Sequence, residues 1–218
     1  MDDLFKQQRP AVESVSEGVT LLAGFADASR LLQALPSIAD AAPFRNMVTP
    51  GGKPIGVAVT NCGTVGWVSD RRGYRYQRHD PESGALWPAM PVSWQSAASE
   101  AARIAGFEDF TANACLINRY LPGNQMTAHQ DKNEGDFGPP VITISTGLPA
   151  EFLVWGESRS GRPTVIPVYE NDVIVMGGPA RLHYHGVRKL KPAAMGRNEH
   201  RISLTFRQVD MSHVRELD

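Results

Sequence analysis

The stretch VITISTGLPAEFLVWGESRSGRPTVIPVYENDVIVM, residues 141–176, decides the fold class. Four short runs rich in β-branched and apolar residues, at 141–147, 151–155, 164–168 and 172–176, alternate with the turn sequences GLPA, ESRSGRP and YEND. β-Branched side chains favour strands, whereas glycine, proline, asparagine and aspartate favour turns. A doubly wound α/β sheet would need a helix between successive strands, and these connections are too short to hold one.

Three further strands are expected outside this stretch, at 114–121, 181–187 and 201–208. The chain after residue 113 therefore consists of seven short strands separated by turns. Strands of this length and spacing are typical of a β-sandwich or barrel with helices packed outside.

The N-terminal half is expected to supply those helices. Asp27 is a candidate N-cap for an apolar-periodic helix that Pro36 interrupts, and an alanine-rich amphipathic helix is predicted over 92–104. Strand candidates at 18–24 and 56–61 accompany them. The predicted fold class is mainly β with flanking helices (α+β).

Composition indicates one ordinary globular domain over residues 1–218, with residues 1–12 flexible. Of the 218 residues 42% are apolar and 21% are charged, and the net charge of −1 is unlike that of a non-specific DNA-binding protein, which is usually basic. No apolar run reaches the roughly 18 residues of a membrane helix, and the N-terminus does not resemble a secretory signal. Cys62 and Cys115 match no zinc spacing, so we expect free buried thiols in the cytoplasm.

A candidate metal site lies in TAHQDKN, residues 127–133. In an extended chain the side chains of His129 and Asp131 leave the same face, which suits chelation of one cation. His183 or His185 in RLHYHGV could complete a set of two histidines and one carboxylate, which typically holds iron(II) and leaves positions open for oxygen and a co-substrate. The alternatives are a surface loop and a histidine without a metal.

The last predicted strand, RISLTFR, places Arg201, Ser203 and Arg207 on one face. Guanidinium groups bind carboxylates in bidentate fashion, so two of them beside an iron site match a dianionic co-substrate. Asn118 and Tyr120 share a face of an earlier strand and offer neutral hydrogen bonds. Because the two arginines are roughly 20 Å apart along an ideal strand, their side chains would have to converge. A solvated basic strand edge is the alternative.

The segment RRGYRYQRH, residues 71–79, interleaves four arginines with two tyrosines. Such a segment can follow a phosphate backbone while its aromatic rings stack on bases. A solvated arginine-rich hairpin is the alternative interpretation.

From Phe44 to Gln208 the chain resembles the AlkB family of alkylated-nucleic-acid dioxygenases, in particular its bacterial members. The resemblance rests on PFRNMVTPGG, TNCG with GW, RRGYRY, WPAMP, ACLINRYLPG, HQDK, YHG and LTFRQ. It implies a double-stranded β-helix, or jelly roll, with residues 43–90 forming a nucleotide-recognition lid. It also implies iron(II), 2-oxoglutarate and O2, and oxidative demethylation of 1-methyladenine and 3-methylcytosine, with release of formaldehyde and succinate. The expected substrate is single-stranded or flipped-out DNA, with RNA left open, and the expected state is a monomer.

The resemblance also implies roles for individual residues. The implied iron ligands are His129, Asp131 and His185, which decides between the two histidines of the YHG region. Asn118, Tyr120 and Arg201 would hold the distal carboxylate of 2-oxoglutarate, and Arg207 the carboxylate beside the metal. The implied contacts to the damaged base are Thr49, Trp67, Tyr74, Arg75, Tyr76 and Arg159.

Three positions depart from the family pattern. Asn133 stands where a second acid usually faces the base, so discrimination between lesions is open. Ser203 replaces an asparagine that often supports 2-oxoglutarate, and His183 replaces an aromatic ring. An iron enzyme acting on a protein or small molecule, and a non-catalytic β-barrel binding module, are the alternative functions.

Overall fold

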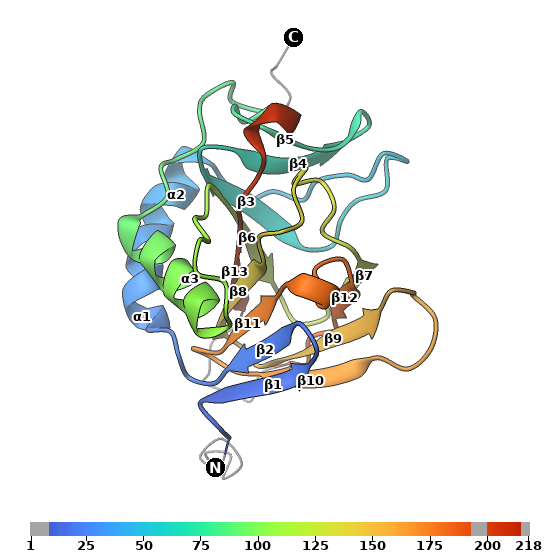
Figure 1. The fold of residues 1–218 in the computed structure, drawn as a ribbon. Coiled ribbons are helices and arrows are strands. Elements are labelled where there is room, and N and C mark those ends of the chain that lie inside the picture. Colours follow the sequence, from blue (N-terminus) through green and yellow to red (C-terminus); the bar gives the residue numbers. More distant parts are fainter. Residues whose placement is uncertain (1–8, 193–199, 215–218) are drawn as a thin grey trace.

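The structure is a computed structural model that describes residues 9–192 and 200–214. Its largest element is a seven-stranded antiparallel sheet with the strand order β1-β2-β11-β8-β13-β6-β3 (Figure 1). Its strands are β1 (Val12–Ser16), β2 (Val19–Leu22), β3 (Ala58–Gly63), β6 (Ala114–Tyr120), β8 (Val141–Gly147), β11 (Val173–Met176) and β13 (Arg201–Arg207).

A second antiparallel sheet, of four strands, has the order β10-β9-β12-β7. Its strands are β7 (Met126–His129), β9 (Ala150–Gly156), β10 (Thr164–Val168) and β12 (Tyr184–Val187). The two sheets share one apolar core, to which the large sheet contributes Leu116 and Ile174 and the small sheet contributes Phe152 and Val154. Two facing antiparallel sheets of this kind form the expected jelly roll.

Helices cover the outer face of the large sheet, at the left in Figure 1. They are α1 (Ala28–Leu31), α2 (Leu35–Ala41) and α3 (Val92–Ile104). Trp94 of α3 is fully buried and meets Phe206 of β13 edge to face, with ring centroids 6.3 Å apart. A separate hairpin of β4 (Gly66–Asp70) and β5 (Gly73–Gln77) lies at the top of the same view. No helix in the described part of the chain is long and apolar enough to cross a membrane.

Each of the seven strands predicted after residue 113 is present, and α3 has the predicted bounds. The expected strand 181–187 starts only at Tyr184, because a 3₁₀ turn precedes it and His183 N donates to Ala180 O (3.0 Å). The sequence patterns do not predict β1, β4, β5 or β7. Residues 1–8 of the expected flexible N-terminus lie outside the described ranges, whereas Arg9 pairs with Asp172 at 2.8 Å.

Candidate metal centre and co-substrate cavity

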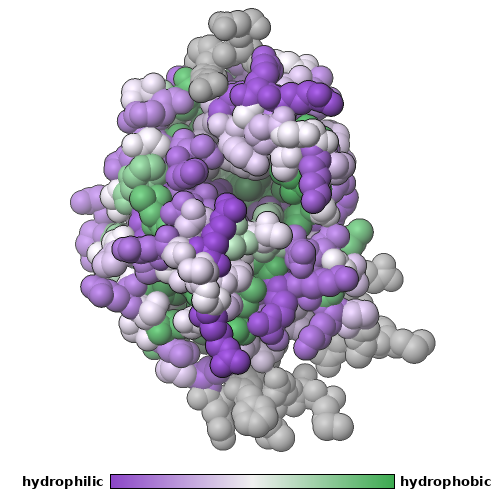
Figure 2. All heavy atoms as spheres, turned by 90° about the vertical axis from the view of Figure 1, so that its right-hand side faces the viewer, coloured by the Kyte–Doolittle hydropathy of each residue, from purple (hydrophilic) through white to green (hydrophobic). Residues whose placement is uncertain are grey.

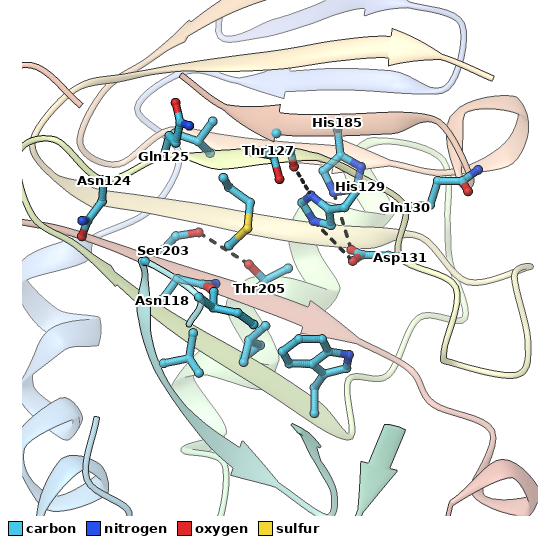
Figure 3. Close-up of a pocket in the computed structure, with 18 of the residues that line it drawn as sticks. Asn118, Asn124, Gln125, Thr127, His129, Gln130, Asp131, His185, Ser203 and Thr205 are labelled. Atoms are coloured by element: carbon cyan, nitrogen blue, oxygen red, sulfur yellow. Dashed lines mark hydrogen bonds and ion pairs between the residues drawn. The ribbon is translucent and has the colours of Figure 1, made fainter. Parts of the chain in front are cut away.

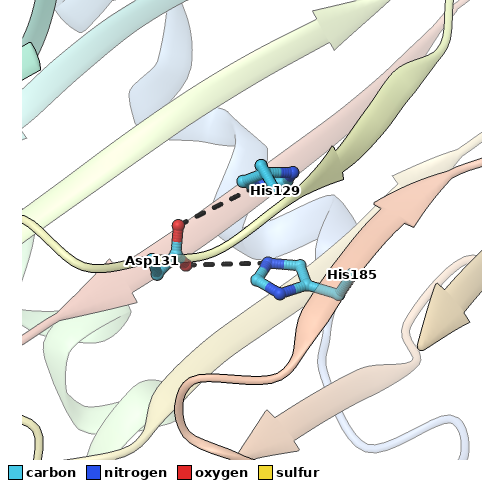
Figure 4. Close-up of side chains that lie close together, drawn as sticks. All are labelled: His129, Asp131 and His185. Atoms are coloured by element: carbon cyan, nitrogen blue, oxygen red, sulfur yellow. Dashed lines mark ion pairs between the residues drawn. The ribbon is translucent and has the colours of Figure 1, made fainter. Parts of the chain in front are cut away.

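His129, Asp131 and His185 lie together where the small sheet meets the following loop (Figure 4). β12 pairs with β7 so that His185 is directly opposite His129, and Asp131 lies two residues beyond His129. The Nε2 atoms of His129 and His185 are 3.9 Å and 3.8 Å from the two carboxylate oxygens of Asp131. Donor atoms of all three residues lie within 4.8 Å of one another. A metal ion with bonds of about 2.1 Å fits between donors at such distances after small adjustments.

Backbone carbonyl groups orient both imidazole rings. Nδ1 of His129 is 3.0 Å from Thr127 O, and Nδ1 of His185 is 3.0 Å from His183 O. A ring that donates from Nδ1 keeps the lone pair of Nε2 free for a metal. Of the two histidines, His185 belongs to this cluster, whereas His183 contacts the His185 ring through its backbone carbonyl and lines a separate cavity.

The protonation states of the cluster suit a cation. Burial raises the pKa of Asp131, but the charge of Arg207 and the two imidazoles outweigh this effect and keep that pKa below its usual range. Burial and the neighbouring His129 lower the pKa of His185 to about 4. At neutral pH Asp131 is therefore anionic and His185 neutral, which is the state that binds metal.

A buried network that sequence reasoning missed holds the Asp131 loop. Arg207 donates to Asp131 Oδ2 from Nη2 (2.8 Å) and Nε (3.1 Å). Arg181 donates to the backbone carbonyl of Asp131 (2.8 Å) and to Glu134 Oε2 (3.1 Å), and the Tyr76 hydroxyl donates to Glu134 Oε1 (2.8 Å). Arg181 lies 50 positions from Asp131 in the chain, so no local pattern could have identified it.

Arg201 shows the opposite situation, a buried cation without an acid. Its side chain is 1% exposed, and Nη2 donates to Ser145 Oγ (2.9 Å). Within the described ranges, Nε and Nη1 of Arg201 and Oδ1 of Asn118 are buried without a hydrogen-bond partner. Burial lowers the pKa of Arg201 to about 10 and raises that of Tyr120 to about 12. Buried polar groups are rarely unpaired in native proteins, and the two free guanidinium donors of Arg201 fit a carboxylate that binds here.

A cavity of about 660 Å³, which we call the central cavity, extends from the three candidate metal ligands to Arg201. Its wall includes the three candidate ligands as well as Asn118, Ser203, Arg201 and Arg207. Figure 3 shows Asn118, Ser203 and Thr205 facing the triad across this space. Ser203 Oγ lies 3.5 Å from Thr205 Oγ1. In Figure 2, the face on the right of Figure 1 is hollowed, with apolar side chains inside and polar ones around the opening. The donor set and the space fit a divalent metal together with a small dicarboxylate.

Most of the predicted base contacts lie on the wall of the central cavity. They are Thr49, Trp67, Tyr74, Asn133 and Arg159. Trp67 and Tyr74 stack with ring centroids 5.7 Å apart and planes inclined by 15°, and the guanidinium of Arg159 lies 5.0 Å from the centre of the Tyr184 ring.

Three predicted site residues are absent from the wall of the cavity. Tyr76 is 1% exposed and bonded to Glu134, and Arg75 is 7% exposed and paired with both carboxylate oxygens of Asp70 at 2.8 and 2.9 Å. Tyr120 is 3% exposed. Their roles in binding remain predictions.

The substitution Tyr76→Phe separates a structural role from a substrate contact. Loss of the hydroxyl leaves buried Glu134 without one donor, so the free energy of unfolding is expected to fall by about 1–3 kcal/mol. The KM for a methylated oligonucleotide should change little. Denaturant unfolding and steady-state kinetics measure the two effects. Tyr74→Phe is the matched control, because Tyr74 is 44% exposed, and it should leave stability unchanged. A raised KM at full stability in Tyr76→Phe would instead indicate a substrate contact.

Comparison with known proteins agrees with this geometry. The family model described as the 2OG-Fe(II) oxygenase superfamily matches residues 18–207. The chain is 44% identical to the alpha-ketoglutarate-dependent dioxygenase AlkB of Salmonella typhimurium, covering 95% of this chain and 98% of that protein. It is 43% identical to the protein of the same name from Escherichia coli, with the same coverage. Among solved structures, that of OsALKBH1 covers 90% of this chain and 99% of its own, with a TM-score of 0.77 and 23% identity, and so supports the fold.

The family model and the AlkB relatives extend over nearly the whole chain, and the residues that the family model matches include all three residues of the triad. The chain therefore belongs to the AlkB family of iron(II)- and 2-oxoglutarate-dependent dioxygenases.

Proposed function

We propose that this protein removes alkyl groups oxidatively from ring nitrogens of bases such as 1-methyladenine and 3-methylcytosine in single-stranded or flipped-out DNA, and the experiment below decides whether RNA is also a substrate. The observation that carries the proposal is the composition of the central cavity. It combines a two-histidine, one-carboxylate cluster, a buried arginine with unpaired donors and a stacked aromatic pair. The cluster matches a metal ion, the buried arginine matches a dicarboxylate and the aromatic pair matches a base.

The inner part of the cavity would hold the cofactors. His129, Asp131 and His185 are the proposed ligands of iron(II), which when bound supplies the oxygen activation that couples decarboxylation of 2-oxoglutarate to oxidation of a C–H bond. For the distal carboxylate of 2-oxoglutarate we propose the unpaired Nε and Nη1 groups of Arg201, with Asn118 and Ser203 on the cavity wall and Tyr120 buried behind it. Arg207 would serve both Asp131 and the carboxylate next to the metal.

The outer part of the cavity would hold the base. The methyl group of a stacked base is inaccessible, so the nucleotide must leave the stack before it can approach the metal. Trp67 and Tyr74 offer aromatic surfaces for the extruded base, and Arg159 and Thr49 complete that wall. Residues 43–90 would then act as the nucleotide-recognition lid of a monomeric single-domain enzyme, and Tyr76 and Arg75 would support it from within.

The chain's own groups position the reactants rather than transfer protons. Asp131 remains anionic, and the carbonyl groups of Thr127 and His183 fix the imidazole rings, so no side chain needs to act as a general base. The overall reaction consumes O2 and 2-oxoglutarate and yields succinate, carbon dioxide, formaldehyde and the unmodified base. Cys62 and Cys115 are free and buried, which fits the reducing cytoplasm as the proposed location.

Formaldehyde release tests the proposal. The protein is mixed with iron(II), 2-oxoglutarate and short oligonucleotides carrying one methylated base, as DNA and as RNA. Formaldehyde is expected from a methylated oligonucleotide and not from its unmethylated counterpart. Release from none of a panel of N-methylated bases would contradict the proposal, as would equal release from the unmethylated strand.

A further inference from the structure

A second cavity, which we call the side cavity, lies next to the central cavity. It has a volume of about 370 Å³, and its wall includes Gln130, Phe137, Glu157, Arg181 and Leu182. Gln130 also lines the central cavity, and its Nε2 donates to Leu182 O at 2.7 Å. Figure 3 shows the side chain of Gln130 pointing away from the triad. The two cavities are therefore neighbours, with Gln130 between them.

The aromatic ring of Phe137 is an accessible part of this wall that is held from beneath. Phe137 is 37% exposed, and the guanidinium carbon of Arg181 lies 5.4 Å from the centre of its ring. Arg181 is 3% exposed and donates to Pro139 O (2.9 Å) and Asp131 O (2.8 Å). Leu182, also 37% exposed, adds apolar surface. A ligand that stacks on a ring already held in place pays little conformational entropy for ordering it.

The charges of the side cavity favour a neutral group over a phosphate. Arg181, whose guanidinium could attract a phosphate, is already paired with Glu134 at 3.1 Å. Glu157 adds an exposed carboxylate to the wall, which repels anions. The volume lies within the roughly 300–1,000 Å³ of sites that hold small molecules. A neutral, planar nucleobase fits these properties, since every base has a face that can stack on an aromatic side chain.

We propose that the side cavity receives the base next to the alkylated one in the same strand, stacked on Phe137. This inference rests on the proposed demethylase function and concerns how the strand beside the lesion is held. Consecutive nucleotides of a strand lie about 3.4 Å apart in a duplex and further apart when they are unstacked. A strand with its lesion in the central cavity therefore brings a neighbouring base to the far side of Gln130. Because stacking does not distinguish the bases, the site favours oligonucleotides over mononucleotides without a sequence preference.

The test measures kcat/KM for substrates that share 1-methyladenine. They are a trinucleotide with the lesion in the middle, the same trinucleotide with an abasic unit on the 5′ or the 3′ side, and the mononucleotide. Phe137→Ala is expected to lower kcat/KM for the trinucleotide by about tenfold and to leave that for the mononucleotide unchanged. An abasic unit on the side that enters the cavity should cause the same loss in the unaltered chain, and Phe137→Ala should then add no further loss. Equilibrium binding without iron or 2-oxoglutarate should follow the same pattern.

Three more variants serve as controls. Phe137→Tyr keeps the ring and should keep the kcat/KM for the trinucleotide. Phe137→Leu keeps an apolar cover over Arg181 without a ring, and it should show a smaller loss, again for the trinucleotide alone. Val92→Ala changes an apolar side chain that is 78% exposed on α3, outside both cavities, and it should have no effect.

The outcomes separate this inference from the proposed function. Equal losses for the trinucleotide and the mononucleotide would show that Phe137 acts through Arg181 on the metal loop, and they would overturn the inference. An unchanged trinucleotide in Phe137→Ala would also overturn it, because the neighbouring base would then lie elsewhere. In both cases formaldehyde release by the unaltered chain leaves the function standing. If no substrate yields formaldehyde, the proposed function itself fails, and the binding measurements still decide whether a neighbouring base stacks on Phe137.

Discussion

Replacement of Asp131 by alanine is expected to abolish iron retention and turnover together. Asp131 supplies the only carboxylate of the candidate cluster in the described part of the chain, and two imidazoles alone hold iron(II) weakly. The substitution also removes the 2.8 Å ion pair of the buried Arg207 guanidinium, which keeps the longer pair with Glu134 at 3.5 Å. Loss of one partner of a buried ion pair costs about 3–5 kcal/mol, so the free energy of unfolding should fall as well.

Iron content after gel filtration and succinate formation measure the two effects, and Asp131→Asn helps to separate them from destabilisation. Asp131→Asn keeps the shape of the side chain, so a folded variant without iron would assign the loss to the carboxylate itself. Asp136→Ala is the matched control, because Asp136 lies in the same loop, is exposed and only accepts from Gly138 N. Full iron retention in a folded Asp131→Ala variant would refute the metal centre.

Arg201→Met is expected to raise the half-saturating concentration of 2-oxoglutarate by about a hundredfold or more. Nε and Nη1 of Arg201 are buried and unpaired within the described ranges, and each can donate a charge-assisted bond to a carboxylate. Two such bonds contribute at least about 3 kcal/mol, which corresponds to about a hundredfold in affinity. Iron binding should be unaffected, since Arg201 does not contact the triad.

The same variant is expected to be more stable than the unaltered protein when 2-oxoglutarate is absent. A buried guanidinium without an acid lowers the free energy of unfolding, and methionine, an apolar side chain of similar length, removes that cost. Thermal unfolding with and without 2-oxoglutarate measures both predictions. Arg103→Met, at an exposed arginine paired with Glu100, should change neither quantity. An unchanged half-saturating concentration in Arg201→Met would show that the dicarboxylate binds elsewhere.

Local patterns predicted the elements of this fold well, because each pattern has a direct structural cause. The amphipathic period of 92–104 produced α3, whose buried side includes Trp94, Ala98, Ala101 and Ala102. Asp27 accepts from Arg30 N at 3.1 Å as the predicted N-cap. The expected interruption at Pro36 is present as a 3₁₀ turn between α1 and α2, with the proline in the first turn of α2. β7, in contrast, has only four residues and a half-exposed sequence, which gives no clear strand signal.

The site could be predicted only in part from the sequence. Alternation along β13 correctly put Arg201 and Arg207 on the face that lines the central cavity. The side chains of Arg201 and Arg207 do not converge on one point. Arg207 donates to Asp131, whereas Arg201 donates to Ser145 elsewhere along the cavity. Register between distant strands brings these groups together, and the contacts of Glu134 and Arg181 depend on the same long-range packing. No short motif contains that information.

The most direct test of the central claim counts succinate and formaldehyde in the same reaction. It uses the methylated oligonucleotide that is turned over best, with iron(II), 2-oxoglutarate and air. If the triad and the arginine pair act as one site, the two products form in equal amounts, and both disappear in Asp131→Ala while Asp136→Ala forms them normally. Formaldehyde without succinate, or either product at full yield from a folded Asp131→Ala variant, would contradict it.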